Sequence, residues 1–490
     1  MGDATDGPGD PDLDLPIKLG PVSNGEFWPQ PLGPIEREAI RRTRMGAERA
    51  ARRLGMDRRR FLRSVGGAAL MLGAIAACES DSRRSDGKRS GGTFAVPDDP
   101  ADADAATEAL TGDELIIDVQ SHFLDFDLSV PGGLGLAAGF PQARCGADDP
   151  RACFTIDTYL EELFLGSDTS IAIISALPIP GDANPQSIVE AEEARRTFAA
   201  VCGDDRLLVH GGVFPQLGPL DAALDGMTEL DEGHDIAAWK VYTHNPAGWW
   251  LDDHDAAVPQ VGNAFLDRVR DTSTDIVCVH KGLGGMLGGL AEFSSPVDIG
   301  PAATAHGDLR FVVYHSGFET GVPEGPYTPE TADLGVNRFI TTLREHDIGP
   351  DGNVYAELGS TWWLVMRDPT TAAHVIGKLV AQLGADRVVW GTDSIWYGSP
   401  QDQIQAFRSF EISAELQEQY GYPALTAEVK AKIFGLNAAA LYGIEATPPR
   451  CDLTREDLQS AREAMPSRRR TYGPETAAQV RALVAAHGVA

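Results

Sequence analysis

Polar side chains with the chemistry of metal ligands recur where short apolar segments end. Residues 115–117 (Leu-Ile-Ile) lead to Asp118, after which Gln120 and His122 alternate along an extended chain and therefore share one face. Two imidazoles spaced in this way can grip one metal ion, but here Gln120 stands in the first position. Further histidines and carboxylates end the later segments, namely His280, His315, Glu357 and Asp393.

The segments that carry these side chains predict a (β/α)8 barrel. Apolar runs typical of buried strands alternate with amphipathic helical patterns such as 187–201, 263–271, 335–346 and 371–384. A doubly wound open sheet is the alternative, but no glycine-rich phosphate loop follows the first run. The expected strands are 115–119, 170–177, 206–214, 236–244, 275–280, 309–317, 353–360 and 387–394.

In such a barrel the active site forms at the carboxyl ends of the strands. A lone histidine there is more often a hydrogen-bonded core or surface group, whereas the shared placement of several indicates a functional site. Lys281 follows His280 and should face the opposite side of its strand. The residues expected at the mouth are Gln120, His122, Lys240, Tyr242, His280, His315, Glu357 and Asp393, with His244 slightly beyond its strand.

Tryptophans follow the fourth, seventh and eighth expected strands. Core packing explains some of them, yet their number favours an apolar or aromatic-lined pocket. Such a pocket suits a small cyclic or aromatic carboxylate, lactone or amide. No glycine-rich nest or arginine cluster accompanies the site, so a phosphorylated substrate is not expected. The tryptophans are Trp249, Trp250, Trp362, Trp363 and Trp396; with Lys240, Tyr242 and Glu357, all of these except Trp363 are the predicted substrate-binding residues.

Residues 113–444 resemble the amidohydrolase-related branch of the amidohydrolase superfamily. The resemblance lies in "IDVQSH", "VCVHKGL", "FVVYHSG", "VVWGTDS" and the closing "IFGLNAAALYGI". It implies a distorted barrel that carries hydrolases, decarboxylases and hydratases. A metal-dependent hydrolase is therefore expected; a decarboxylase of the same fold and a non-catalytic exported binding protein are the alternatives.

The same resemblance assigns roles to the strand-end residues. His122 and His280 match metal ligands, Asp393 matches the carboxylate that ligates the metal or activates its water, and His315 matches the group that polarises the substrate or shuttles protons. Gln120 departs from the pattern and would be a weak, neutral fourth ligand or an outer-shell group. A retained metal is favoured over a degenerate site because the other three positions are intact. One divalent ion, zinc most plausibly, is expected. Lys240 could bridge two metals when carbamylated, or pair with a nearby carboxylate.

The N-terminal region has the features of an export signal. The paired Arg58 and Arg59, followed by the apolar run 65–77, resemble a twin-arginine signal, and the run is too short to span a bilayer comfortably. It ends in a lipobox-like sequence in which Cys78 would be lipidated. These features predict an exported protein, periplasmic or at the cell surface. Residues 1–55 are expected to form a disordered basic leader, unless translation starts at Met56, and 79–112 a flexible tether.

Bulk composition limits the partners. The 490 residues carry a net charge of -31, which argues against nucleic acid and leaves a small-molecule substrate as the expected partner. Contact with a membrane is expected only through the lipid at Cys78, and a homo-oligomer stays open. An oxidising compartment favours a disulfide between Cys145 and Cys153. The barrel should span 113–447, and 448–490 should form helices packed outside it.

Overall fold

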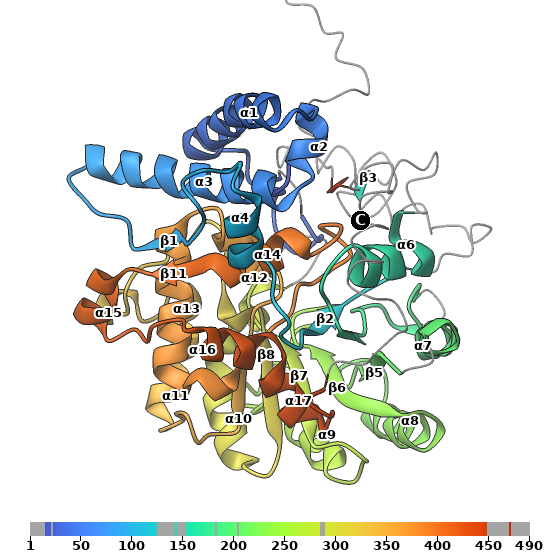
Figure 1. Cartoon of the computed structure of the whole chain (residues 1–490). Helices are drawn as coiled ribbons and strands as arrows, with labels where there is room; N and C mark the ends of the chain where they lie inside the picture. Colours follow the sequence, from blue (N-terminus) through green and yellow to red (C-terminus); the bar gives the residue numbers. More distant parts are fainter. Residues whose placement is uncertain are drawn as a thin grey trace, which may run out of the picture.

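Parallel strands form a closed barrel at the centre of the protein (Figure 1). The computed structural model describes residues 15–20, 23–124, 143–144, 153–181, 184–202, 205–284, 290–447 and 470–471. The eight strands of the barrel, in neighbour order, are β2 (Ile117–Ser121), β4 (Ile171–Ile174), β5 (Leu207–Gly212), β6 (Ile236–Tyr242), β7 (Ile276–His280), β8 (Arg310–Tyr314), β9 (Val354–Glu357) and β10 (Val388–Val389). The predicted (β/α)8 barrel is confirmed.

The barrel closes between its first and last strands. The backbone N–H of Asp393 donates to the carbonyl of Gln120 at 2.8 Å, and that of Val119 donates to Trp390 at 3.0 Å. The buried carboxylate of Asp118 adds a side-chain link, since it accepts the N–H of Thr392 at 2.9 Å. The segments that carry Gln120 and Asp393 are therefore held together although they lie far apart in the chain.

Alternation along the strands separates two apolar cores. Ile276 and Cys278 belong to the inner cluster that fills the barrel, while Val277 and Val279 pack in the outer cluster under the helices. The main helices of the outer layer are α7 (Ile188–Cys202), α8 (Leu220–Gly233), α9 (Gly262–Val269), α10 (Ile299–Ala305), α11 (Gly335–Glu345), α13 (Pro369–Leu383) and α14 (Gln401–Ser409).

Shorter helices complete the barrel. They are α6 (Ile156–Leu160), α12 (Thr361–Val365), α15 (Ala414–Tyr420), α16 (Ala427–Ala431) and α17 (Asn437–Tyr442). The predicted closing helix is present as α17, whose Asn437 amide donates to the carbonyls of Ala385 and Val388 at 2.7 Å each. These bonds anchor the start of β10, and the apolar face of α17 packs onto the inner core.

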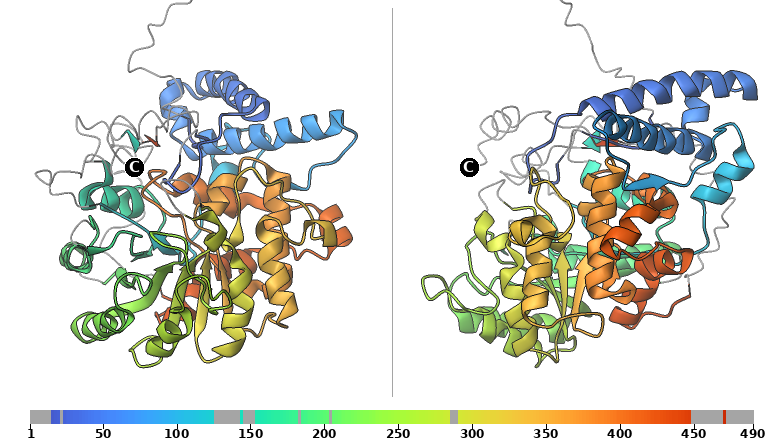
Figure 2. Two further views of the ribbon diagram at one scale, coloured as in Figure 1. Left: turned by 180° about the vertical axis from the view of Figure 1, so that it is seen from behind. Right: turned by 90° about the vertical axis from the view of Figure 1, so that its left-hand side faces the viewer.

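The expectation of a disordered leader is wrong for the described residues before position 56. They include α1 (Pro34–Leu54), which lies beside α3 (Val65–Ser85) in both views of Figure 2, with the short α2 (Arg58–Leu62) between them. Ala39, Thr43, Ala47 and Ala50 recur at helical spacing and are buried. Because these residues are small, the apolar stripe is inconspicuous in sequence among the exposed arginines.

The expected tether at 79–112 is also folded. Strand β1 (Gly92–Phe94) pairs antiparallel with β11 (Phe410–Ile412), and α4 (Ala103–Leu110) follows it. The carboxylate of Glu79 is buried and accepts the hydroxyl of Thr370 at 2.6 Å. Strand addition and a buried polar contact order a segment whose small polar residues indicated coil.

The apolar run of the expected signal forms the buried part of α3, where Cys78 is a buried free thiol. Among the described helices, none combines the length and apolarity needed to cross a membrane. Of the C-terminal region, the described part is β12 (Arg470–Thr471), paired with β3 (Ala143–Arg144), and the helices expected at 448–490 otherwise lie outside the described residues. Cys153 is disulfide-bonded; Cys145 lies outside the described residues, so their pairing stays a prediction.

Candidate active site

On one side of the barrel mouth, the end of the barrel formed by the carboxyl ends of the strands, several side chains contact Asp393. Its Oδ1 accepts the Gln120 amide at 3.1 Å and lies 3.2 Å from Nε2 of His122. The indole N–H of Trp396 donates to the same oxygen at 3.2 Å, and the Ser360 hydroxyl donates to Oδ2 at 2.5 Å. Burial is the largest single influence on the pKa of Asp393 and acts to raise it, but the hydrogen bonds from His122 and Ser360 and the neighbouring histidines together outweigh it, and the pKa is lowered. Asp393 is therefore an ionised carboxylate.

His280 and His315 form the other half, with ring centroids 4.6 Å apart. Nε2 of His280 lies 3.2 Å from the carbonyl of Leu283, and Nδ1 of His315 lies 2.7 Å from that of Gly359. A carbonyl oxygen can only accept, so both of these nitrogens carry the proton. Burial lowers the pKa of His315 to about 4 and that of His280 well below its ordinary value, so both rings are neutral.

This tautomer changes the role expected for His315. Its Nε2 carries a lone pair that points into the mouth. This nitrogen can ligate a cation but cannot donate a hydrogen bond to a substrate carbonyl. His280 Nδ1 is in the same state. Fixing a ligating ring through the opposite nitrogen is the usual arrangement of metal-bound histidines.

Lys240 and Glu357 lie buried at the floor of the mouth. The ammonium of Lys240 sits 3.4 Å from the ring centroid of Tyr314 and, within the described part of the chain, makes neither a hydrogen bond nor a salt bridge. Burial lowers its pKa to about 8. Burial likewise raises the pKa of Glu357 to about 8, although the carboxylate accepts the N–H of His315 at 3.0 Å. The ion pair considered for Lys240 is not formed, and its charge remains available to an anionic ligand.

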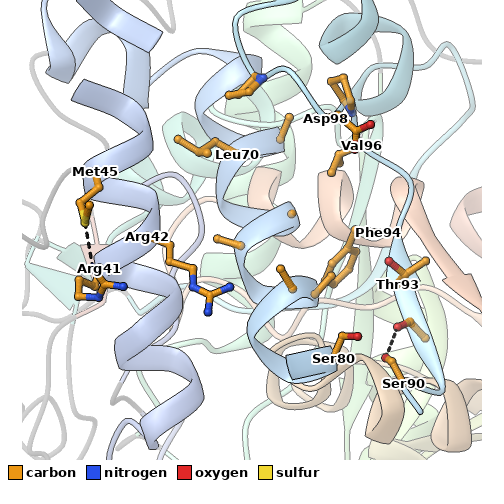
Figure 3. A pocket seen from close by; sticks show the side chains of 18 of the residues that line it. Arg41, Arg42, Met45, Leu70, Ser80, Ser90, Thr93, Phe94, Val96 and Asp98 are labelled. Atoms are coloured by element: carbon orange, nitrogen blue, oxygen red, sulfur yellow. Dashed lines mark hydrogen bonds between the residues drawn. The ribbon is translucent and has the colours of Figure 1, made fainter. Parts of the chain in front are cut away.

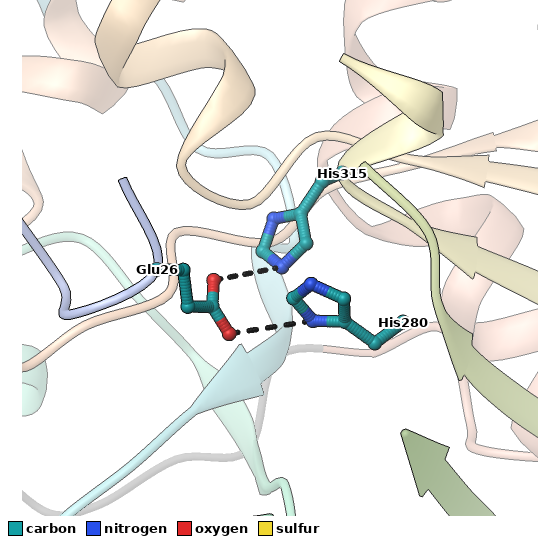
Figure 4. Close-up of side chains that lie close together, drawn as sticks. All are labelled: Glu26, His280 and His315. Carbon is teal, nitrogen blue, oxygen red and sulfur yellow. Dashed lines mark ion pairs between the residues drawn. The ribbon is translucent and has the colours of Figure 1, made fainter. Parts of the chain in front are cut away.

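A residue that sequence analysis missed lies between the two histidines. Glu26 enters the mouth on the turn 23–27, and its oxygens lie 3.3 Å from Nδ1 of His280 and 3.4 Å from Nε2 of His315 (Figure 4). Burial and the charge of Asp393 raise the pKa of Glu26 well above its ordinary value. The dipeptide Asn24-Gly25 was the available signal, because Asn-Gly marks tight turns.

The predicted substrate-binding aromatics fall into two groups. Trp396 stacks on His122 at 5.6 Å, and Tyr242 stacks on His280 at 5.1 Å, so both line the site. Trp249 and Trp362 are fully buried core residues instead. The indole of Trp362 donates to the carbonyl of Gln403 in the helical layer, and that of Trp249 donates to the carbonyl of Tyr242. Trp250 packs on Phe293 beyond β6.

The residues at the mouth fit a divalent ion. Several buried ligand atoms have no hydrogen-bond partner among the described residues: Oε1 of Gln120, Nδ1 of His122, Nδ1 of His280 and Nε2 of His315. Imidazole nitrogens together with carboxylate oxygens suit zinc, iron and manganese alike, so the donor set does not select zinc. The amide nitrogen of Gln120 donates to Asp393, while its Oε1 is without a hydrogen-bond partner among the described residues.

A separate cavity of about 680 Å³ lies between α1, α3 and β1 (Figure 3). Its base is apolar, with Leu70 and Phe94, and its rim carries arginines. These charges are already neutralised in part, since Arg41 pairs with Glu38 and Arg42 pairs with both Glu38 and Asp81. The cavity has no link to the barrel mouth through the residues that line it.

Comparison with known proteins identifies a family. Residues 117–444 match the family model described as amidohydrolase. Among curated proteins no match is found.

Solved structures of similar architecture include a putative 2-pyrone-4,6-dicarboxylic acid hydrolase from Pseudomonas putida (16% identity, 68% of this chain, 99% of that chain, TM-score 0.39). Another is 5-carboxyvanillate decarboxylase from Novosphingobium aromaticivorans, complexed with manganese (15%, 69%, 99%, 0.41). A third is an amidohydrolase from Burkholderia multivorans with bound zinc (16%, 67%, 99%, 0.38). Similarities at this level do not assign a substrate to this chain.

Proposed function

Since the chain belongs to the amidohydrolase family, we propose that it is a metal-dependent hydrolase of a small cyclic or aromatic carboxylate, lactone or amide. The observation that carries the proposal is the convergence of neutral His280 and His315, with their lone pairs directed inward, on the mouth that also holds ionised Asp393. A divalent ion bound there would polarise a carbonyl group and lower the pKa of a water molecule.

Other steps of the reaction would be carried out by side chains of the barrel mouth. Asp393 is the carboxylate whose pKa is lowered, so it can accept a proton from the attacking water, and its hydrogen bond with His122 steadies the charge during transfer. The unpaired ammonium of Lys240 can hold a substrate carboxylate. The indole of Trp396 and the ring of Tyr242 supply flat apolar walls for a ring-shaped substrate.

A decarboxylase is the second candidate, and the crowding of Asp393 favours it. That carboxylate already receives hydrogen bonds from Gln120, Trp396, Ser360 and Asn24, in addition to its contact with His122; these contacts leave little room for a water molecule. In a decarboxylation, no water attacks and the proton goes to the carbon that loses carbon dioxide.

Turnover in ¹⁸O-labelled water separates the two reactions. A panel of aromatic carboxylates, lactones and amides is incubated with the metal-loaded protein, and products are analysed by mass spectrometry. Label in the organic product establishes hydrolysis, and release of carbon dioxide with no label in the organic product establishes decarboxylation. Asp393→Asn is expected to abolish either activity. A metal-loaded protein that converts no member of the panel would contradict the proposal.

We also propose export through the twin-arginine route, with zinc as the metal and a lipid at Cys78. The support is the motif around Arg58 and Arg59 and the small residues before Cys78. Since this route carries folded proteins, loading a metal before export is compatible with it. In the folded chain Cys78 is buried in α3, so lipidation requires that helix to unpack, and cleavage before Cys78 would remove Glu26. The barrel mouth described above is therefore that of the unprocessed chain.

A further inference from the structure

The turn 23–27 places the carboxylate of Glu26 in the barrel mouth. Gly25 has a φ of 94°, which favours glycine, and the N–H of Glu26 donates to Oδ1 of Asn24 at 2.9 Å. The Asn24 amide donates both to Oε2 of Glu26 at 2.5 Å and to Oδ2 of Asp393 at 2.7 Å. Phe27 is buried beside the turn. The Glu26 side chain is thus positioned from its own segment and from the barrel.

The contacts of Glu26 with the two histidines are contacts between acceptors. Nδ1 of His280 and Nε2 of His315 carry lone pairs, because the opposite nitrogen of each ring donates to a backbone carbonyl. Neither nitrogen has a hydrogen-bond partner in the described part of the chain. Two such lone pairs and a carboxylate repel one another unless a cation lies among them, because a single proton on Glu26 could serve only one of the two nitrogens.

The spacing matches that of ligands around one ion. Two ligands about 2.1 Å from a tetrahedral metal are separated by about 3.4 Å. The carboxylate oxygens of Glu26 lie 3.3 and 3.4 Å from the histidine nitrogens. The ligand atoms of Glu26, His280 and His315 all lie within 4.8 Å of one another.

We propose that Glu26 is a metal ligand, together with His280 and His315, so that the N-terminal segment supplies the anionic ligand of the centre. The barrel residues near this site are weaker candidates for the anionic ligand. Gln120 is neutral and donates its amide to Asp393, whose oxygens are already occupied by hydrogen-bond donors. The metal centre is therefore complete only when residues 23–27 are seated in the mouth.

The proposal rests on the metal dependence proposed above but not on the reaction catalysed. Its test compares the full-length protein with Glu26→Gln, which keeps the shape of the side chain and removes its charge. Glu36→Gln is the matched control, since Glu36 lies in the same N-terminal segment but in the first turn of α1. Each protein is stripped with a chelator and titrated with zinc chloride in competition with a chromophoric chelator. Thermal unfolding checks that each variant is folded.

We expect Glu26→Gln to weaken zinc binding by more than the tenfold to hundredfold that loss of an outer-shell partner costs. Glu36→Gln should bind as the wild type does. Cobalt(II) at saturation provides a second measurement: its visible absorption bands should shift in Glu26→Gln and not in the control, because they report the ligand set.

The outcomes separate this proposal from the proposed function. Equal zinc affinity and equal cobalt spectra in Glu26→Gln and wild type overturn the assignment of Glu26 and leave the metal centre standing. A wild-type protein that binds neither zinc nor cobalt overturns the metal dependence itself. Unchanged metal affinity with tighter binding of benzoate in Glu26→Gln also overturns the assignment, since Glu26 would then occupy the place of a substrate carboxylate.

Discussion

The buried ion pair between Lys281 and Asp298 should contribute strongly to the free energy of unfolding of the protein. Both side chains are fully buried, and Nζ lies 2.8 Å from Oδ2 of Asp298. The ammonium also donates to the carbonyl of Phe293 at 3.1 Å, and Asp298 accepts the N–H of Leu251 at 2.9 Å. Burial lowers the pKa of Lys281 and raises that of Asp298, so each depends on the other to stay charged.

Asp298→Asn keeps the shape of the side chain and leaves the ammonium without its counter-charge. The Coulomb energy at 2.8 Å is about 6 kcal/mol for an effective dielectric constant of 20, which sets an upper bound on the loss. Breaking a buried pair by removing one partner costs about 3–5 kcal/mol. We expect the free energy of unfolding to fall by that amount. The double variant Lys281→Met with Asp298→Leu should recover at least half of the loss, because no buried charge remains.

Urea unfolding of the metal-free protein at pH 7, followed by tryptophan fluorescence, measures these changes. Glu193→Gln is the control, since Glu193 pairs with Arg196 at 3.2 Å on the surface, where both side chains are 65% or more exposed. Such a pair contributes about 0–1 kcal/mol. If Asp298→Asn and Glu193→Gln prove equally mild, or if the double variant is less stable than Asp298→Asn, the reasoning about the buried charge is refuted.

Three further predictions concern the metal, pH and export. Gln120→Ala should weaken zinc affinity about tenfold to a hundredfold, as for an outer-shell partner, and Gln120→His should tighten it; calorimetric titration checks both, and an unchanged affinity contradicts the role. Burial holds the pKa of His210 well below its ordinary 6.5, so the unfolded chain binds the extra proton and stability is lost as pH falls below about 6.5. His210→Asn should make this pH dependence less steep in urea titrations at several pH values, and an equally steep profile would contradict the role of His210. Replacing Arg58 and Arg59 by Lys should retain precursor in the cytoplasm, and Cys78→Ala should release exported protein from membranes; cell fractionation tests both, and normal export of the first variant excludes the twin-arginine route.

The barrel was predictable because its signals are local. Runs such as 276–280 are apolar, β-branched and regularly spaced, and strand alternation alone places Cys278 and His280 on one face and Lys281 on the other. The structure agrees: Cys278 lies in the inner core and Lys281 reaches Asp298 under the helices. Parallel strands then bring their carboxyl ends together whatever the details of packing, so the convergence of the strand-end residues also followed from sequence.

The positions of aromatic side chains could not be predicted from local sequence. Trp362 and Trp396 both follow strands and are equally plausible pocket residues in sequence. The indole of Trp362 instead donates into the helical layer, whereas that of Trp396 donates to Asp393. Which side a loop residue faces depends on the path of the loop, and no periodicity in the chain encodes that path.

By itself, the sequence determined the barrel and the chemical types at its mouth, Gln120 included, because both depend on neighbouring residues or on strand period. Tertiary structure alone decided which nitrogens of His280 and His315 face inward, since the carbonyls of Leu283 and Gly359 select the tautomers. It also decided the place of Glu26, more than 250 residues before His280 in the chain. That contact depends on Asn24, which bridges Glu26 to Asp393, and on the burial of Phe27 beside the turn. The free energy of such burial is a property of two surfaces rather than of either sequence segment.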